Sequence, residues 1–359
     1  MSRRSSNRIT IKQVALEAGV STQTVSRVVN NVPGVVPETR QHVQEAIDRL
    51  GYRPNVIARS LIQRRSCTLG IVTSGIEFYG PSRTLVGIEQ KANELGYSVH
   101  LSLLHRPETN DVGNLLNSLL SWQVDGILWA TQEIGDNLAW LDRERVPVPL
   151  VLLEIEPRPN VASVNVNSRD GGRMGVEHLI QQGYQQIGII TGPSNWWCAR
   201  ERLQGWRDAL SEAGLPHKEH QIVEGDWSTG SGARGLKQLV EQYPKMEAVF
   251  ACNDQMALGV LQTSRQLGRR VPHDLAVVGY DDIPEAEYFW PSLTTVRQNL
   301  AQLGGTGVDL LIDMISAKQQ GNEAPSQNIW LEPELIVRSS SMNGSELCDK
   351  RGGNRIHTL

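Results

Sequence analysis

The sequence predicts an N-terminal all-α helix-turn-helix headpiece followed by a two-lobed α/β domain of parallel sheets flanked by helices. The chain of 359 residues is longer than one compact core normally holds. Its first 52 residues carry short amphipathic helical patterns separated by a glycine-containing turn. From residue 67 onward, short apolar runs alternate with amphipathic helices, and two such sets follow one another.

The net charge of −4 hides an uneven distribution along the chain. Residues 1–66 contain 11 Lys and Arg against 4 Asp and Glu, a net +7, and the other residues contain 24 against 35, a net −11. A basic segment on an acidic body indicates that the segment alone meets a polyanion. Charge by itself leaves a solvated basic tail open.

Several classes of protein are disfavoured by composition. The four cysteines lie far apart and share no metal-ligand spacing with histidines, which argues against a metal site or a disulfide framework. No apolar run reaches the roughly 18 residues of a membrane span, and the polar N-terminus does not resemble a signal peptide. No Gly-rich phosphate loop or catalytic triad can be read. We therefore expect a soluble cytoplasmic protein without membrane partner, metal or cofactor, and not an enzyme.

Two short helices begin the headpiece. Thr10 can cap the first, in which four apolar residues fall at helical spacing, and Gly19 suits the left-handed residue that ends it. Ser21 can cap the second, whose Val25 and Val28 face inward. Two such helices joined by a tight turn form a helix-turn-helix, and its second helix can lie in the major groove of DNA.

The outward face of that second helix suits base recognition. Gln23 can pair with adenine edges, Arg27 can pair with guanine, and the methyl group of Thr22 can pack on a thymine methyl. Exposed polar residues of a helix are commonly just solvated, but these lie at the end of the helix that the motif presents to bases. A third helix is predicted over residues 37–50, ended by Gly51, and should close a three-helix core.

Residues 53–66 form a predicted hinge between the two domains. Pro54 disfavours helix at Arg53, and Asn55 can cap a short helix that runs through Ala58 and Leu61. An isolated helix shorter than roughly 12 to 15 residues is marginal in water. We therefore expect this helix to be ordered only when it packs against DNA.

The body is predicted as a series of strands and helices. Strands are expected over 68–73, 97–103, 126–129, 150–153, 162–166 (an edge strand), 186–191, 222–224, 248–252, 275–278 and near 329–337. Helices are expected over 82–95, 112–122, 171–182, 200–213, 231–243 and 255–267. This alternation is typical of parallel sheets covered by helices on both faces, and its two sets predict two lobes.

Ligands of open parallel sheets bind beyond the carboxyl ends of the strands. The residues that follow the predicted strands are Thr73, Ser74, His105, Arg106, Glu154, Asp226, Trp227, Asn253, Asp254, Tyr280, Asp281 and Asp282, with Arg202 in the following helix. Carboxylates, an amide and arginines can bind hydroxyl groups, and an indole can stack on the C–H face of a sugar. The set therefore indicates a neutral polyhydroxylated ligand, although an Asp after a strand often only caps the next helix.

The headpiece resembles that of the lac and gal repressor family of bacterial regulators. The resemblance rests on the runs ITIKQVA (9–15), AGVS (18–21), TVSRVVN (24–30), GYRPN (51–55) and ARSL (58–61). It implies DNA contacts from Thr10, Ser21, Thr22, Gln23, Thr24, Ser26, Arg27, Asn30, Asn55, Ala58 and Leu61. Leu61 would be the wedge inserted into the minor groove at the operator centre. One departure is Val36, which stands where the family has a Ser or Thr cap before the third helix.

The resemblance extends over the body through GVEHL (175–179), EGDWS (224–228), NDQMALG (253–259) and VVGYDD (277–282). It implies the family's periplasmic-binding-protein-like fold, with the effector held by Arg202, Asn253 and Asp281. The further pocket positions that it implies are Ser74, Phe78, Arg106, Glu154, Trp227 and Gln298.

Departures from the family pattern bear on specificity. Glu154 replaces an aspartate, Val166 and Leu300 occupy two aromatic positions, and the neighbouring wall carries Phe78 and Gly80. Trp196 and Trp197 are additional aromatic residues that belong either to the cleft or to the core. The hydroxyl-binding residues are retained, whereas the apolar wall is changed. This combination predicts a sugar or glycoside ligand that is galactoside-like but not necessarily the ligand usual in the family.

The expected domains are a DNA-binding headpiece (1–52), the hinge (53–66), an effector-binding and dimerisation domain (67–341) and a polar, disordered tail (342–359). The N-lobe is expected at about 67–166 plus 298–328, and the C-lobe at about 167–295 plus 329–341. Sustained C-terminal heptads are absent, so the tetramerisation helix known in the family is missing and a homodimer is expected.

These observations predict a dimeric repressor that a sugar-like effector releases from operator DNA. The effector would favour another spacing of the lobes and lower DNA affinity by typically about 1–3 kcal/mol. The alternative within the fold is a co-repressor, such as a purine, that strengthens DNA binding. A sugar-binding transport protein would instead carry a signal peptide and no basic head, and a sugar-processing enzyme would turn over glycosides.

Overall fold

The computed structural model describes residues 9–29, 32–53, 65–105, 112–142, 146–322 and 326–343. The chain divides into two compact units, residues 1–66 and 67–359, which are described separately. The predicted hinge helix lies outside the described residues.

The first unit contains three helices, α1 (Ile11–Glu17), α2 (Thr22–Val29) and α3 (Pro37–Leu50). The predicted start and end of the third helix are confirmed. The core consists of two small apolar residues from each helix: Val14, Ala15, Val25, Val28, Val43 and Ala46. The two inward residues of each helix pack against the inward residues of the other two helices. The three helices therefore form one small core.

Local sequence signals set the helix ends of this unit. The side chain of Gln13 accepts a hydrogen bond from the backbone N–H of Thr10 at 2.8 Å, and Ser21 Oγ accepts one from the N–H of Thr24 at 3.1 Å. Gly19 and Gly51 follow the last turns of α1 and α3, and they adopt positive φ angles of 64° and 65°. Val36 makes no side-chain cap, and Pro37 occupies the first helical position instead.

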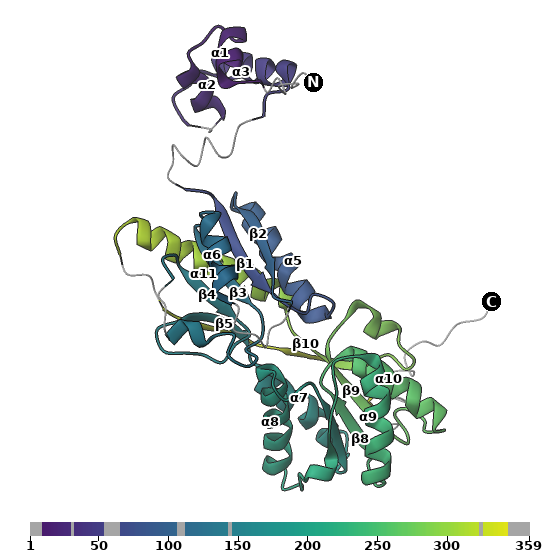
Figure 1. Ribbon diagram of the computed structural model, residues 1–359. Coiled ribbons are helices and arrows are strands. Elements are labelled where there is room, and N and C mark those ends of the chain that lie inside the picture. The colour runs from purple at the N-terminus through teal and green to yellow at the C-terminus, as the bar shows by residue number, and fades with distance from the viewer. Residues whose placement is uncertain are drawn as a thin grey trace, which may run out of the picture. The chain divides into compact units, whose positions relative to one another are not determined.

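The second unit has two lobes, each built on a six-stranded sheet (Figure 1). The first sheet has the order β11-β5-β4-β3-β1-β2, with β1 (Thr68–Thr73), β2 (Ser98–Leu103), β3 (Gly126–Ala130), β4 (Leu150–Leu153), β5 (Ala162–Val166) and β11 (Asn328–Leu331). All five pairings in it are parallel. This sheet and its helices α5 (Tyr79–Glu94), α6 (Val112–Ser121) and α11 (Leu300–Gln319) are called the first lobe.

Strand residues of the first lobe alternate between two apolar layers. Leu69 and Ile71 of β1 pack in one cluster with residues of α5 and α11, whereas Val72 packs in another cluster with α6. Since successive strand side chains point to opposite faces, α5 and α11 cover one face of the sheet and α6 covers the other. The short 3₁₀ helix η1 (Ala139–Asp142) lies with α6.

The second sheet has the order β12-β10-β9-β8-β6-β7. It contains β6 (Ile187–Thr191), β7 (Ile222–Glu224), β8 (Ala248–Ala251), β9 (Ala276–Asp281), β10 (Thr294–Arg297) and β12 (Glu334–Ile336), of which only β12 is antiparallel to its neighbour. With α7 (Ser168–Gln181), α8 (Trp197–Glu212), α9 (Thr229–Gln242) and α10 (Asp254–Gln266), this sheet forms the second lobe. The 3₁₀ helices η2 (Glu219–Gln221) and η3 (Pro284–Tyr288) complete it.

Three expectations for the first lobe and its boundary were wrong. The strand at 162–166 is not an edge strand, because β11 pairs with its outer side and all five of its residues are buried. The region near 329–337 forms two strands, and the first of these, β11, belongs to the first lobe. The last crossing between lobes therefore lies between Leu331 and Glu334 and not at residue 328. The 20-residue helix α11 was not predicted.

The end of the described chain is also better anchored than its polar sequence indicated. Ser340 and Ser341 are fully buried. Ser340 Oγ donates to the carbonyl of Val277 at 2.6 Å and accepts from the N–H of Thr294 at 2.8 Å. Met342 is buried and Asn343 bonds to Gln182, so the first two residues of the predicted tail are held, while residues 344–359 lie outside the described residues.

None of the helices in the described ranges combines the length and the apolar character needed to cross a membrane.

Candidate functional site

The exposed face of α2 is one candidate site. Thr22, Gln23 and Arg27 are exposed, whereas Val25 and Val28 on the other side of the helix are fully or almost fully buried. The buried pair fixes the helix against α1 and α3, so the exposed residues are presented by a packed element. Such an arrangement allows α2 to enter a DNA groove with polar side chains facing the bases.

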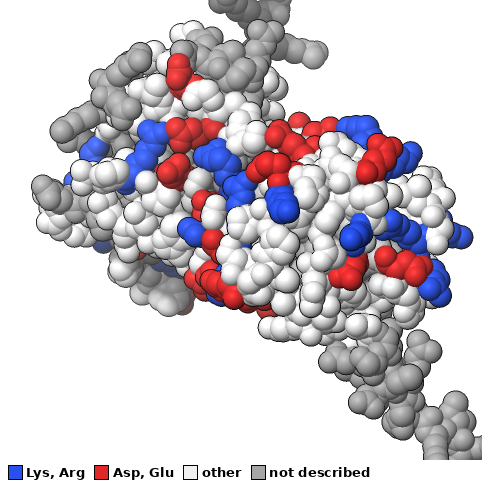
Figure 2. Space-filling view, turned by 90° about the horizontal axis from the view of Figure 1, so that it is seen from below, with Lys and Arg blue, Asp and Glu red and all other residues white. Residues whose placement is uncertain are grey.

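The other predicted DNA-binding residues lie in three environments. Thr10 and Ser21 are exposed at the starts of α1 and α2, and Thr24 and Ser26 are half-buried on α2. Asn30, Asn55, Ala58 and Leu61 lie outside the described residues. Figure 2 shows acidic and basic side chains interspersed over the face of the second unit that is in view.

A pocket of about 660 Å³, including its open mouth, is lined by residues of both lobes of the second unit. Its wall consists of Phe78, Tyr79, Gly80, Pro81, Thr84, Ala130, Gln132, Leu153, Glu154, Trp196, Cys198, Arg202, Trp227, Asn253, Asp281, Gln298 and Leu300.

Seven of the nine predicted effector residues line this pocket: Phe78, Glu154, Arg202, Trp227, Asn253, Asp281 and Gln298. Ser74 is not part of the wall and shares a hydrogen bond with the hydroxyl of Thr131. Arg106 lies outside the described residues. Of the positions that depart from the family pattern, Gly80 and Leu300 line the pocket, but Val166 does not.

Arg202 is the buried cation of the pocket, with 4% of its surface exposed. Its Nη1 donates to the carbonyl oxygen of Cys252 at 2.6 Å, and its guanidinium carbon lies 3.7 Å from the centre of the Tyr280 ring. A Cβ at Gly172 of α7 would overlap the backbone of Arg202, so this glycine allows the close approach of α7 to α8. Tight packing thus fixes the position of the charge.

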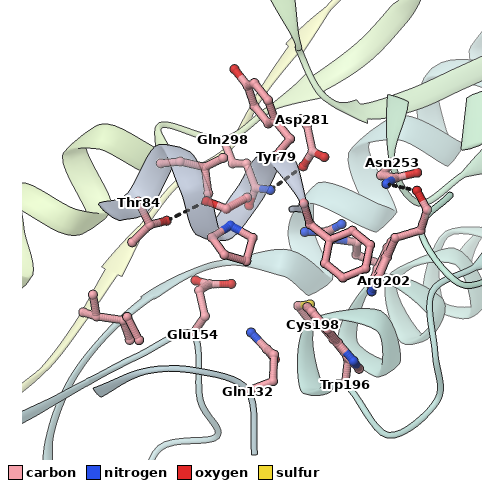
Figure 3. Close-up of a pocket in the computed structure, with 17 residues that line it drawn as sticks. Tyr79, Thr84, Gln132, Glu154, Trp196, Cys198, Arg202, Asn253, Asp281 and Gln298 are labelled. Carbon is pink, nitrogen blue, oxygen red and sulfur yellow. Dashed lines mark hydrogen bonds between the residues drawn. The ribbon is translucent and has the colours of Figure 1, made fainter. Parts of the chain in front are cut away.

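Two carboxyl groups lie in the wall, Asp281 buried and Glu154 half-buried. Asp281 Oδ1 accepts a hydrogen bond of 2.5 Å from Gln298 Nε2, and Glu154 Oε1 accepts one of 2.6 Å from the N–H of Val166. Burial raises the pKa of Asp281 to about 6 although Arg202 and Gln298 oppose the shift. Burial likewise raises the pKa of Glu154 to about 7, against the Val166 hydrogen bond. Figure 3 shows Glu154 and Gln132 on the side of the pocket opposite Asp281 and Gln298.

Asn253 connects the pocket to the helix behind it. Its Oδ1 accepts from the N–H of Met256 at 2.8 Å and so caps α10, while its Nδ2 donates to the carbonyl of Trp227 at 2.9 Å (Figure 3). The neighbouring Asp254 is fully buried and accepts bonds from Thr295 and the N–H of Ile283. Asp254 therefore has a structural role, whereas Asn253 both caps the helix and borders the cavity.

Aromatic residues form the remaining part of the wall. The rings of Phe78 and Trp196 meet edge to face with centroids 6.0 Å apart, and Trp196 lies 5.6 Å from Trp227. A Cβ at Gly192 would overlap the indole of Trp227, so that glycine provides the space for the ring. The question left open by the sequence is answered for both tryptophans: Trp196 lines the pocket, and Trp197 is buried against Trp330.

Several wall residues were not predicted from the sequence, among them Tyr79, Thr84, Gln132 and Cys198. Gln132 follows the end of β3 and could have been found by the strand-end rule that found Glu154. Cys198 lies four residues before Arg202 on α8, which places both on one helix face. Tyr79 and Thr84 lie on the first turns of α5, whose start was expected three residues later.

Four polar atoms of the wall residues are buried behind the cavity surface and have no hydrogen-bond partner in the described structure: Arg202 Nε, Trp227 Nε1, Gln298 Oε1 and Gln132 Oε1. Buried polar atoms are normally paired, so these four are exceptions. No group of three or more His, Cys, Asp or Glu that could hold a metal ion occurs in the described part of the chain.

The raised pKa of Glu154 predicts a pH-dependent stability. Between an ordinary carboxyl pKa near 4.3 and about 7, the unfolded state loses this proton while the folded state keeps it, so stability falls as pH rises through that window. Glu154→Gln retains the acceptor for the Val166 N–H and removes the titration. We expect the wild-type chain to lose roughly 2–3 kcal/mol more stability than the variant between pH 5 and pH 8. Urea unfolding of both proteins at both pH values measures this difference. Equal losses of stability in the wild-type chain and the variant would contradict the raised pKa of Glu154.

Comparisons with known proteins agree with these features. A model described as "Bacterial regulatory proteins, lacI family" matches residues 10–55, and a "Periplasmic binding protein-like domain" model matches residues 176–341. The HTH-type transcriptional repressor PurR of Haemophilus influenzae is 34% identical over 92% of this chain and 98% of its own length. The lactose operon repressor of Escherichia coli is 34% identical over 93% of this chain and 91% of its own.

Solved structures show the same likeness. The lac repressor dimer bound to operator and the anti-inducer ONPF has a TM-score of 0.83 at 34% identity, covering 94% of this chain and 100% of that one. A complex of the transcriptional regulator CelR with cellobiose has a TM-score of 0.69 at 34% identity, covering 93% of this chain and 100% of that one. The resemblance and the fold class predicted from the sequence are confirmed.

Proposed function

The chain belongs to the lacI family of bacterial regulatory proteins, and from this premise we propose that it is a repressor released from its operator by a sugar or glycoside in the interlobe pocket. As a member of that family it is a DNA-binding transcriptional regulator. The ligand class, the sign of its effect and the residues that bind it are the proposal.

The pocket wall is the observation that carries the sugar assignment. Asp281, paired with Gln298, faces Glu154 across a cavity that also contains Arg202 and Asn253. Two carboxyl groups on opposite sides can accept hydrogen bonds from several hydroxyl groups of one ligand, and the amide and guanidinium groups can donate to ring and hydroxyl oxygens. A neutral ligand with many hydroxyl groups satisfies more of these groups than a ligand with few donors.

A purine-like co-repressor is the second candidate. Relatives named PurR are among the similar proteins, and the rings of Phe78, Trp196 and Trp227 can also stack on a flat heterocycle. With such a ligand the effect on operator affinity would have the opposite sign, because a ligand that prefers the DNA-bound spacing of the lobes strengthens operator binding.

A thermal-shift panel of monosaccharides, glycosides and purine bases with the full chain separates the two candidates. A ligand at 100 times its dissociation constant stabilises the folded state by about 2.7 kcal/mol. We expect a carbohydrate to raise the melting temperature and purines to leave it unchanged. If purines but no carbohydrate raised the melting temperature, the effector would be a purine and the proposed effector class would be wrong.

We propose that the regulator acts as a cytoplasmic homodimer. Two headpieces related by a two-fold axis match the symmetry of a palindromic operator. The second lobe carries Tyr288 and Trp290 with 81% and 91% of their surfaces exposed, and large exposed aromatic residues are typical of protein interfaces. Sedimentation of the full chain as a monomer at micromolar concentration would contradict this assembly.

A further inference from the structure

We propose that the pocket contains a second, aromatic subsite, formed by Phe78, Trp196 and Trp227, which selects a ligand of two linked rings over a single sugar ring. The inference rests on the proposed function, since it assumes that the polar part of the pocket holds a sugar. The second ring is either another sugar or an aryl group, because both present a face that stacks on aromatic side chains.

The three rings form one continuous surface across the lobe boundary. Phe78, just before α5 in the first lobe, meets Trp196 of the second lobe at 88°, with centroids 6.0 Å apart. Trp196 then meets Trp227 at 64° and 5.6 Å. Edge-to-face contacts of this kind hold the rings in defined orientations. A ligand in contact with this surface therefore touches both lobes.

This surface is preorganised by the backbone. Trp196 is the residue before the first turn of α8, and its N–H donates to the carbonyl of Pro193 at 2.9 Å. Gly192 leaves room for the indole of Trp227, and a Cβ at Gly75 would come within 3.1 Å of the Phe78 ring. The rings are thus placed by tight turns of the backbone.

Phe78 and Trp196 form the open part of the aromatic surface, whereas Trp227 is buried and lies next to Arg202, whose guanidinium carbon is 5.6 Å from its ring centre. In Figure 3, Trp196 lies at the end of the pocket away from Asp281 and Gln298. Phe78 and Trp196 are only half-buried, although both line the cavity, whereas Arg202, Asn253, Asp281 and Gln298 are buried. Apolar ring surface therefore remains open to the cavity next to a polar floor. A single hydroxylated ring on the floor leaves that surface in water, and a second linked ring covers it.

The arrangement also explains why two tryptophans follow each other in the chain. Trp196 faces the pocket, while Trp197 is buried against Trp330 of β11 in the first lobe, with centroids 6.0 Å apart. Trp197 anchors the start of α8 to the first lobe and leaves its neighbour at the pocket wall. Trp196 is accordingly the specificity-determining residue of the pair.

Isothermal titration of the full chain tests the subsite with three groups of ligands. The single-ring probes are D-glucose and D-galactose, the two-sugar probes are cellobiose and lactose, and the aryl probes are the p-nitrophenyl β-glycosides of the same sugars. We expect at least one two-ring class to bind ~10-fold or more tightly than its matching monosaccharide. The class that gains affinity identifies the second ring.

Trp196→Ala should remove most of that gain while changing monosaccharide affinity by less than about threefold. Trp196→Phe keeps an aromatic ring and should retain part of the gain, and Trp122→Ala is the control, because Trp122 is an exposed tryptophan that does not line the pocket. Equal losses for one-ring and two-ring ligands, or no two-ring preference in the wild-type chain, would overturn the subsite and leave the sugar function standing. Absence of binding by every carbohydrate would overturn the proposed function, and the subsite with it.

Discussion

Replacement of Arg202 by methionine is expected to abolish the response to the pocket ligand while the protein still binds its operator. Arg202 is the buried cation of the wall, and its removal leaves Asp281 and Glu154 without the charge that opposes the rise in their pKa values. Truncation of one partner in a buried charged network typically costs about 2–5 kcal/mol, or roughly 30-fold to several thousandfold in affinity.

Titration calorimetry with the ligand and fluorescence anisotropy with labelled operator measure the two effects separately. Arg200→Met is the matched control, because Arg200 lies on the same helix, is exposed and does not line the pocket. Ligand affinity of Arg202→Met within a factor of about three of the wild-type value would show that the ligand does not depend on this wall.

Replacement of Gln23 or Arg27 by alanine is expected to weaken operator binding and leave ligand binding unchanged. Both side chains are exposed on α2, which belongs to a compact unit separate from the pocket. A lost base contact costs about 1–3 kcal/mol and relaxes specificity at one position, whereas a lost phosphate contact lowers affinity on all sequences and reduces the salt slope by about one.

Binding to operators with single base changes, at several salt concentrations, distinguishes the two kinds of contact. Gln44→Ala and Arg49→Ala on α3 are the controls, since they change the same residue types on another helix of the unit. Loss of operator affinity in the controls equal to that in the α2 variants would mean that charge or stability, and not the α2 face, governs recognition.

Elements with strong local signals were predictable from the sequence. The bounds of α3 follow from Pro37 at its start and Gly51 after its end, and β4 is a continuous apolar run of strand length. In the same way, polar residues directly after strands identified Glu154, Asn253 and Asp281 as wall residues. Each of these features depends on a few neighbouring residues.

Elements set by distant packing were not predictable. Helix α11 contains Gly304, Gly305 and Gly307, and each glycine lowers intrinsic helix stability by about 1 kcal/mol relative to alanine. The structure accounts for two of them. A Cβ at Gly304 would overlap the backbone of α5, and one at Gly307 would crowd Leu153, so close packing overrides helix propensity. The buried position of β5 likewise depends on β11, more than 160 residues later.

The detailed geometry of the pocket wall depends on features that the sequence pattern does not contain. Glu154, Trp227 and Asp281 have positive φ angles of 56°, 69° and 113°, which non-glycine residues rarely adopt and which direct their side chains in ways that periodicity does not indicate. The aromatic contact between Phe78 and Trp196 joins residues of different lobes, so it depends on the spacing of the two sheets. The family resemblance indicated Phe78 and the sequence left Trp196 open between cleft and core, but neither predicted this contact.

The coupling between pocket and DNA is tested most directly by measuring operator affinity of the full chain with and without saturating ligand, and ligand affinity with and without operator. Linkage requires the same factor in both experiments, and a coupling of about 1–3 kcal/mol corresponds to roughly 5- to 150-fold. We predict that the ligand lowers operator affinity by a factor in this range and that operator lowers ligand affinity equally. Operator affinity that does not change at saturating ligand would contradict the regulatory role of the pocket.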